Sequence, residues 1–73
     1  MTTVQDFWIT IQSLAEDKAK QLYQNHYSGS IHCMVFPDKA FIYGVATEER
    51  INAILEDIKL LGNDYGVVRK EVV

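Results

Sequence analysis

The first third of the chain places apolar residues at the spacing of an α-helix. Residues that recur at i, i+3 and i+4 lie on one helix face, and this stripe comprises Phe7, Trp8, Ile11, Leu14, Ala15, Ala19 and Leu22. The opposite face carries the polar residues Ser13, Glu16, Asp17, Lys20 and Gln24. The pattern predicts a long helix from about Val4 to about His26. Ile9 points away from the apolar stripe, which makes it a candidate surface contact.

Both ends of this predicted helix carry terminal signals. Thr3 is a suitable N-cap residue, and Asp6 follows three residues later as in a capping box, where Glu or Gln is more usual. The turn-rich sequence Ser28-Gly29-Ser30 predicts that the helix ends near Asn25–Tyr27.

Two runs rich in β-branched and aromatic residues follow, and they predict a β-hairpin over residues 31–36 and 40–46. Pro37, the only proline, opens the turn between them together with Asp38. A two-residue loop that begins with proline fits the favoured hairpin turns poorly, whereas a four-residue loop built on a type I turn accepts it. A loop of two residues and a loop of four residues place the same side chains on each face of the hairpin.

The sequence then predicts a second helix that starts at Thr47. Thr47 is a suitable N-cap, Glu48 and Glu49 suit the positive end of the helix dipole, and Gly62 suits the C-terminus. Its buried stripe comprises Ile51, Ile54, Leu55, Ile58 and Leu61. The final run, residues 67–73, is either an edge strand guarded by Arg69, Lys70 and Glu71 or a loose tail.

These elements predict one α+β domain over residues 1–73. The domain has two layers and the order α-β-β-α, with a possible C-terminal β-strand, and its central antiparallel hairpin packs against two helices. The order α-β-β-α-β resembles a ferredoxin-like domain that has lost its first strand. That resemblance implies a gap in the sheet that a partner's strand could fill, and it assigns no function.

The two faces of the predicted hairpin differ in chemistry. Side chains alternate across a strand, so one face holds small and branched residues, namely Ile31, Cys33, Val35, Ile42, Gly44 and Ala46. We assign this face to the core, where Gly44 and Ala46 would let a helix backbone come close. The other face holds His32, Met34, Phe36, Phe41, Tyr43 and Val45, residue types that are enriched in protein interfaces. Alternatively, one helix covers each face and both sets are ordinary core.

Length and cysteine content restrict how the domain gains stability. A chain of 73 residues buries only about 60% of the surface that its unfolded form exposes. Cys33 is the only cysteine, so no disulfide forms within the chain, and with His26 and His32 as the only histidines we expect no metal site. Of the usual additional sources of stability for so small a domain, self-association is the one that remains.

Charge and hydropathy restrict the classes of partner that we expect. The ten acidic and seven basic residues give a net charge of −3, and the basic residues are scattered, so we expect no nucleic-acid partner. The apolar runs are far shorter than the roughly 20 residues needed to cross a bilayer, and no basic run precedes an apolar stretch at the N-terminus. We therefore expect no membrane association and a cytoplasmic location.

The sequence contains no catalytic signature. His32 and Cys33 could in principle form a thiolate site, but adjacent strand residues point to opposite faces. We expect no enzymatic activity and no cofactor. The favoured hypothesis is a small interaction or regulatory protein that forms a homodimer or binds another protein through the aromatic hairpin face, for example as an inhibitor or adaptor. The alternatives are a small-molecule sensor with a ligand site at a subunit interface, and a thiol- or metal-dependent enzyme.

Overall fold

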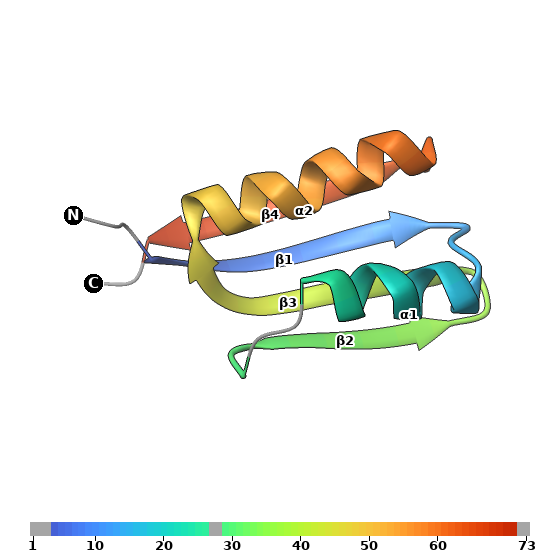
Figure 1. The fold of residues 1–73 in the computed structure, drawn as a ribbon, viewed down its shortest axis with the longest axis horizontal. Coiled ribbons are helices and arrows are strands. Elements are labelled where there is room, and N and C mark those ends of the chain that lie inside the picture. Colours follow the sequence, from blue (N-terminus) through green and yellow to red (C-terminus); the bar gives the residue numbers. More distant parts are fainter. Residues whose placement is uncertain (1–3, 27–28, 72–73) are drawn as a thin grey trace.

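The computed structural model describes residues 4–26 and 29–71, which form one four-stranded antiparallel sheet and two helices (Figure 1). In chain order the elements are β1 (Val4–Gln12), α1 (Glu16–Asn25), β2 (Ile31–Phe36), β3 (Lys39–Thr47), α2 (Glu48–Leu61) and β4 (Tyr65–Glu71). The strands lie in the order β2-β3-β1-β4. The expected α+β class is therefore confirmed, but the order is β-α-β-β-α-β and not α-β-β-α.

The difference lies in the first segment, where the predicted helix over Val4–His26 is wrong for its first nine residues. Those residues form β1, a central strand that pairs with β3 on one side and β4 on the other. Phe7, Ile9 and Ile11 alternate along it and are all buried, which is the period of two that a strand requires. The expected Thr3 N-cap lies outside the described residues.

A sharp bend at Ser13 separates β1 from α1. Ser13 has a φ of 56°, in the left-handed region that non-glycine residues rarely adopt. Its N–H donates to the Asp38 carbonyl at 2.8 Å, and the Asn63 side chain donates to its carbonyl at 3.2 Å. The rest of the helix prediction holds over Glu16–Asn25, where Ala19 and Leu22 are buried; Tyr27 and Ser28, at its predicted end, lie outside the described residues.

The predicted hairpin is confirmed, but its loop has two residues and not the four that we considered the better fit for a leading proline. Phe36 pairs with Lys39 across Pro37 and Asp38. Gly44 makes a close backbone contact, although not with a helix as expected. Its φ is 143°, and a Cβ built on it would lie 2.0 Å from the Ser30 carbonyl oxygen.

The second predicted helix is confirmed together with its signals. The Thr47 side chain accepts a hydrogen bond from the Arg50 N–H at 3.2 Å, and Gly62 ends the helix with a left-handed φ of 79°. The predicted stripe is buried at Ile51, Ile54, Leu55 and Ile58, and Leu61 packs against it. No helix among the described residues is long and apolar enough to span a bilayer.

The C-terminal run forms an edge strand, so the first of the two predicted alternatives is confirmed up to Glu71. β4 pairs antiparallel with β1, and residues 72 and 73 lie outside the described part of the chain. The order β-α-β-β-α-β is that of the ferredoxin-like motif. Because β1 is present in the centre of the sheet, the gap that we expected for a partner's strand does not exist.

The core lies between the sheet and the two helices, which both cover the same face of the sheet (Figure 1). Ile31 and Ile42 on the small-residue face of the hairpin are 2% exposed, and Cys33 and Ala46 pack against the same core. Val35 of that face, near the hairpin turn, is 37% exposed. The alternative in which each helix covers a different face is therefore wrong.

Candidate functional site

The second face of the sheet points away from both helices, and we call it the open face. Residues that pair directly across antiparallel strands share a face, so the register defines its members. They are Val4, Asp6, Trp8, Thr10 and Gln12 of β1; His32, Met34 and Phe36 of β2; Lys39, Phe41, Tyr43, Val45 and Thr47 of β3; and Gly66, Val68 and Lys70 of β4.

Aromatic rings contact one another across the middle of the open face. The Trp8 ring stacks on the Tyr43 ring with centroids 4.7 Å apart, and it lies 5.2 Å from the Phe41 ring. Phe36 meets Phe41 edge to face at 5.5 Å, and the His32 ring lies 5.5 Å from Tyr43. These contacts join β1, β2 and β3 into one continuous aromatic surface.

Much of this surface remains accessible to solvent in the isolated subunit. Trp8 is 39% exposed, Phe36 is 42% exposed and Met34 is 36% exposed. Phe41 and Tyr43 are half-buried by their neighbours. Large apolar side chains that gather at one place with this exposure are unusual on a protein that acts alone.

Six of the seven predicted contact residues lie on this face, namely His32, Met34, Phe36, Phe41, Tyr43 and Val45. The placement of Ile9 on an exposed helix face is wrong: it lies on β1, points to the helices and is fully buried. Its neighbour Trp8, assigned to the helical stripe, is instead central to the open face. The signal that could have found Trp8 is the alternation of Phe7, Trp8 and Ile9, which fits a strand with two different faces.

Few charges lie on the open face. Among its described side chains Asp6 is the only carboxylate, and Lys39 and Lys70 are the only permanent cations. The Lys39 ammonium lies 5.7 Å from the centre of the Phe41 ring, a favourable cation–π arrangement. The acidic residues that make the chain negative therefore lie elsewhere, mainly on the helices and loops.

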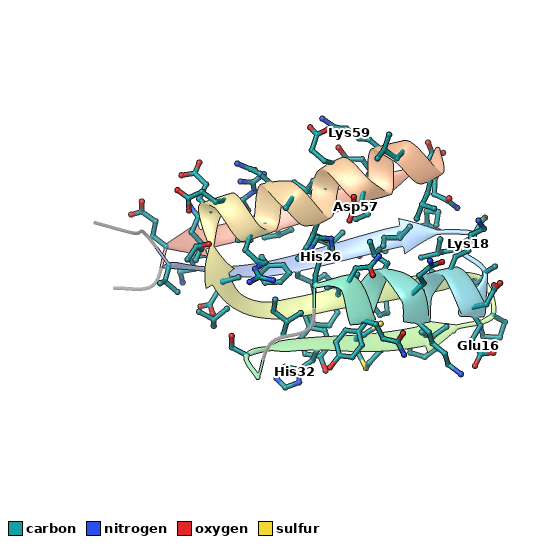
Figure 2. All side chains as sticks on the ribbon, viewed as in Figure 1. Glu16, Lys18, His26, His32, Asp57 and Lys59 are labelled. Atoms are coloured by element: carbon teal, nitrogen blue, oxygen red, sulfur yellow. The ribbon has the colours of Figure 1, made fainter. Side chains whose placement is uncertain are left out.

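His32 and Cys33 do not form a joint site. His32 lies on the open face beside Tyr43 and points away from the helices (Figure 2). Cys33 packs against the core on the other face, and burial raises the pKa of its thiol. Within residues 4–26 and 29–71 no group of three or more His, Cys, Asp or Glu side chains is arranged to hold a metal ion.

A polar contact that the sequence did not reveal joins the two helices. His26 Nε2 at the end of α1 lies 2.5 Å from Asp57 Oδ2 on α2, and the two side chains point toward each other in Figure 2. The His26 side chain is only 13% exposed. The residues are 31 apart in the sequence, so no local pattern connects them. The contact holds α1 against α2.

Hollows lie beside the open face and between the helices. One, of about 290 Å³, is lined by residues that include Thr47 and Arg50, and another, of about 220 Å³, lies between α1 and α2 beside Asp57. A third, of about 420 Å³, lies beside the start of α1. The open face borders the first hollow at Val45 and the third at Phe36.

Neither a model of a known protein family nor a curated protein sequence matches this chain. The chemistry and exposure of its own surfaces are therefore the basis on which its function is inferred.

Proposed function

We propose that this protein is a non-enzymatic interaction or regulatory domain that self-associates through the open face of its sheet. The observation that carries the proposal is that an aromatic sheet face remains uncovered by both helices. Its composition of Trp, Tyr, Phe and Met is that of the energetically important centre of a protein interface. Regulation of a larger assembly, as an inhibitor or adaptor, would use the same surface.

The size of the face suits a second copy. The strands are six to nine residues long, and with a rise of about 3.4 Å per residue and a spacing of about 4.8 Å between strands the face measures about 500 Å². Two copies would bury about 1,000 Å², which is near the lower limit for a biological interface. A dimer would also supplement the thin core of a 73-residue subunit.

The charges favour a protein partner over a nucleic acid. Aromatic rings on the central strands of a four-stranded sheet can stack on the bases of single strands. Such sites also need several cations along the backbone path, whereas the open face offers Lys39 and Lys70 against Asp6. In addition, Trp8 and Tyr43 stack on each other, so one face of each ring is already occupied.

Sedimentation velocity across micromolar concentrations tests the proposal. The wild type should be dimeric, and Tyr43→Glu should give a folded monomer because it introduces a carboxylate into the centre of the interface. The matched control is Leu60→Glu, since Leu60 is 84% exposed on α2 and lies outside the open face. A wild type that stays monomeric throughout, or a Leu60→Glu variant that dissociates as readily as Tyr43→Glu, would contradict self-association through the open face.

The same samples test the nucleic-acid alternative. Trp8 is the only tryptophan, so its fluorescence reports on any molecule that stacks on the open face. Salt-dependent quenching by a single-stranded oligonucleotide, at concentrations at which the protein remains monomeric, would overturn the proposal in favour of nucleic-acid binding. Unchanged fluorescence supports a protein partner.

A further inference from the structure

Gly66 lies on the open face near the start of β4, and nothing within the subunit requires a glycine there. The described glycines with positive φ are Gly44 and Gly62. A Cβ at Gly44 would collide with a backbone carbonyl, but a Cβ at Gly66 would meet no atom within 4 Å. Glycine weakens a strand, and inside one it often marks a position that another molecule approaches closely.

The open face carries larger side chains on β2 than on β4 at the two levels near Gly66. At the level of Gly66 the register aligns Met34 on β2, Phe41 on β3 and Thr10 on β1. The neighbouring level runs from His32 through Tyr43 and Trp8 to Val68. At these levels the β2 edge therefore carries Met34 and His32, whereas the β4 edge carries only Gly66 and Val68 and stands lower.

We propose that two copies pack face to face about a two-fold axis that runs along the strands between β3 and β1. This arrangement rests on the self-association proposed above. The rotation exchanges β2 with β4 and β3 with β1, so the bulky β2 edge of each copy covers the lower β4 edge of the other. Met34 then fills the space above the partner's Gly66, and Tyr43 faces the partner's Trp8.

The other in-plane two-fold axis, across the strands, fits the surface less well. It places β2 over β2 and β4 over β4, so bulky side chains meet at one edge of the interface and a gap remains above Gly66 at the other. Interfaces of stable dimers are packed as densely as protein interiors. The axis along the strands also places Lys39 over the partner's Gln12, with which Lys39 pairs in the register.

A pair of size changes tests this arrangement. Gly66→Leu should leave the subunit folded, because the position has free space, and should raise the dimer dissociation constant at least tenfold because the new side chain meets the partner's Met34. Adding Met34→Ala should recover most of that loss. Gly29→Leu is the control, since Gly29 also has no atom within 4 Å of a built Cβ and lies outside the sheet.

Each outcome has a separate meaning. If the wild type does not self-associate, the proposed function fails; if it does and Gly66→Leu leaves its dissociation constant unchanged, the arrangement alone is wrong. Rescue of Gly66→Leu by Val68→Ala instead of Met34→Ala would indicate the axis across the strands and would also overturn the arrangement.

Cross-linking provides a measurement that does not depend on the folding of Gly66→Leu. In a Cys33→Ala background, Met34→Cys and Gly66→Cys lie on opposite edge strands, three strand spacings or about 14 Å apart within one subunit. A thiol-reactive cross-linker shorter than 10 Å should therefore join them only between subunits and give a covalent dimer. Met34→Cys alone should give none. A dimer from the single variant, or none from the pair, contradicts the arrangement.

Discussion

Trp8 and Ile9 are neighbours on β1 that should affect different equilibria when they are replaced by alanine. Trp8 is 39% exposed on the open face and Ile9 is fully buried on the helix side. Because a tryptophan side chain can bury up to about 250 Å², about 100 Å² of Trp8 remains to be covered in each copy. Trp8→Ala should therefore weaken the dimer, whereas Ile9→Ala should weaken the subunit.

The magnitudes follow from these areas. Two copies of Trp8 contribute about 200 Å², which at about 25 cal/mol per Å² is at most about 5 kcal/mol of dimer stability. Part of this gain is offset by the ordering costs of association, so we expect about 2–4 kcal/mol, or a rise of about 30- to 1,000-fold in the dissociation constant. Ile9→Ala should lower the unfolding free energy of the subunit by about 2–5 kcal/mol through the cavity that it leaves.

Sedimentation equilibrium measures the dimer dissociation constant. Urea unfolding at protein concentrations below that constant measures the unfolding free energy of the subunit. Trp8→Ala also removes the ring contacts with Tyr43 and Phe41, so its subunit stability must be measured in the same series. The reasoning is refuted if Trp8→Ala leaves the dissociation constant unchanged, or if Ile9→Ala weakens the dimer of folded subunits as much as Trp8→Ala does.

Three further predictions concern the subunit itself. The Cys33 thiol, whose pKa is raised by burial, should react with iodoacetamide more slowly than the unfolded chain and should reach its half-maximal rate at a higher pH; equal rates would contradict its burial. Gly44→Ala should destabilise the fold by about 2–4 kcal/mol in urea unfolding, because its φ is 143° and its Cβ would overlap the Ser30 carbonyl; a neutral effect would show that this approach is not tight. Asp57→Asn should lower the unfolding free energy by about 1 kcal/mol, since it weakens the contact with His26. Amide hydrogen exchange in α1 should become faster; unchanged exchange would contradict the inference that this contact holds α1 against α2.

The parts of the fold that are specified locally could be predicted from the sequence. Thr47 and Gly62 limit α2 through their own cap chemistry, and the alternation from residue 31 to residue 46 fixes the two faces of the hairpin. Six of the predicted contact residues followed from that alternation alone. Their location on one face is independent of whether the loop has two or four residues.

The first segment could not be predicted because its pattern fits two periods. Phe7, Ile11 and Leu14 are spaced by four and three residues, as on a helix, while Phe7, Ile9 and Ile11 alternate as on a strand. Tertiary pairing decides between them, since β3 and β4 supply hydrogen-bonding partners on both sides of β1. The same pairing brings Trp8 and Gly66 to the open face, and its β1–β4 part joins residues more than fifty positions apart.

The most direct test of the central claim, that a second copy covers the open face, is the emission of Trp8 during dilution. Trp8 is the only tryptophan and lies in the middle of the face. As the protein is diluted from about 100 μM to about 10 nM, a range that covers weak to moderate dimer affinities, the emission should shift to longer wavelength along a two-state curve. That curve should coincide with the monomer–dimer transition seen by sedimentation. Emission typical of a solvent-exposed indole at every concentration would contradict the account.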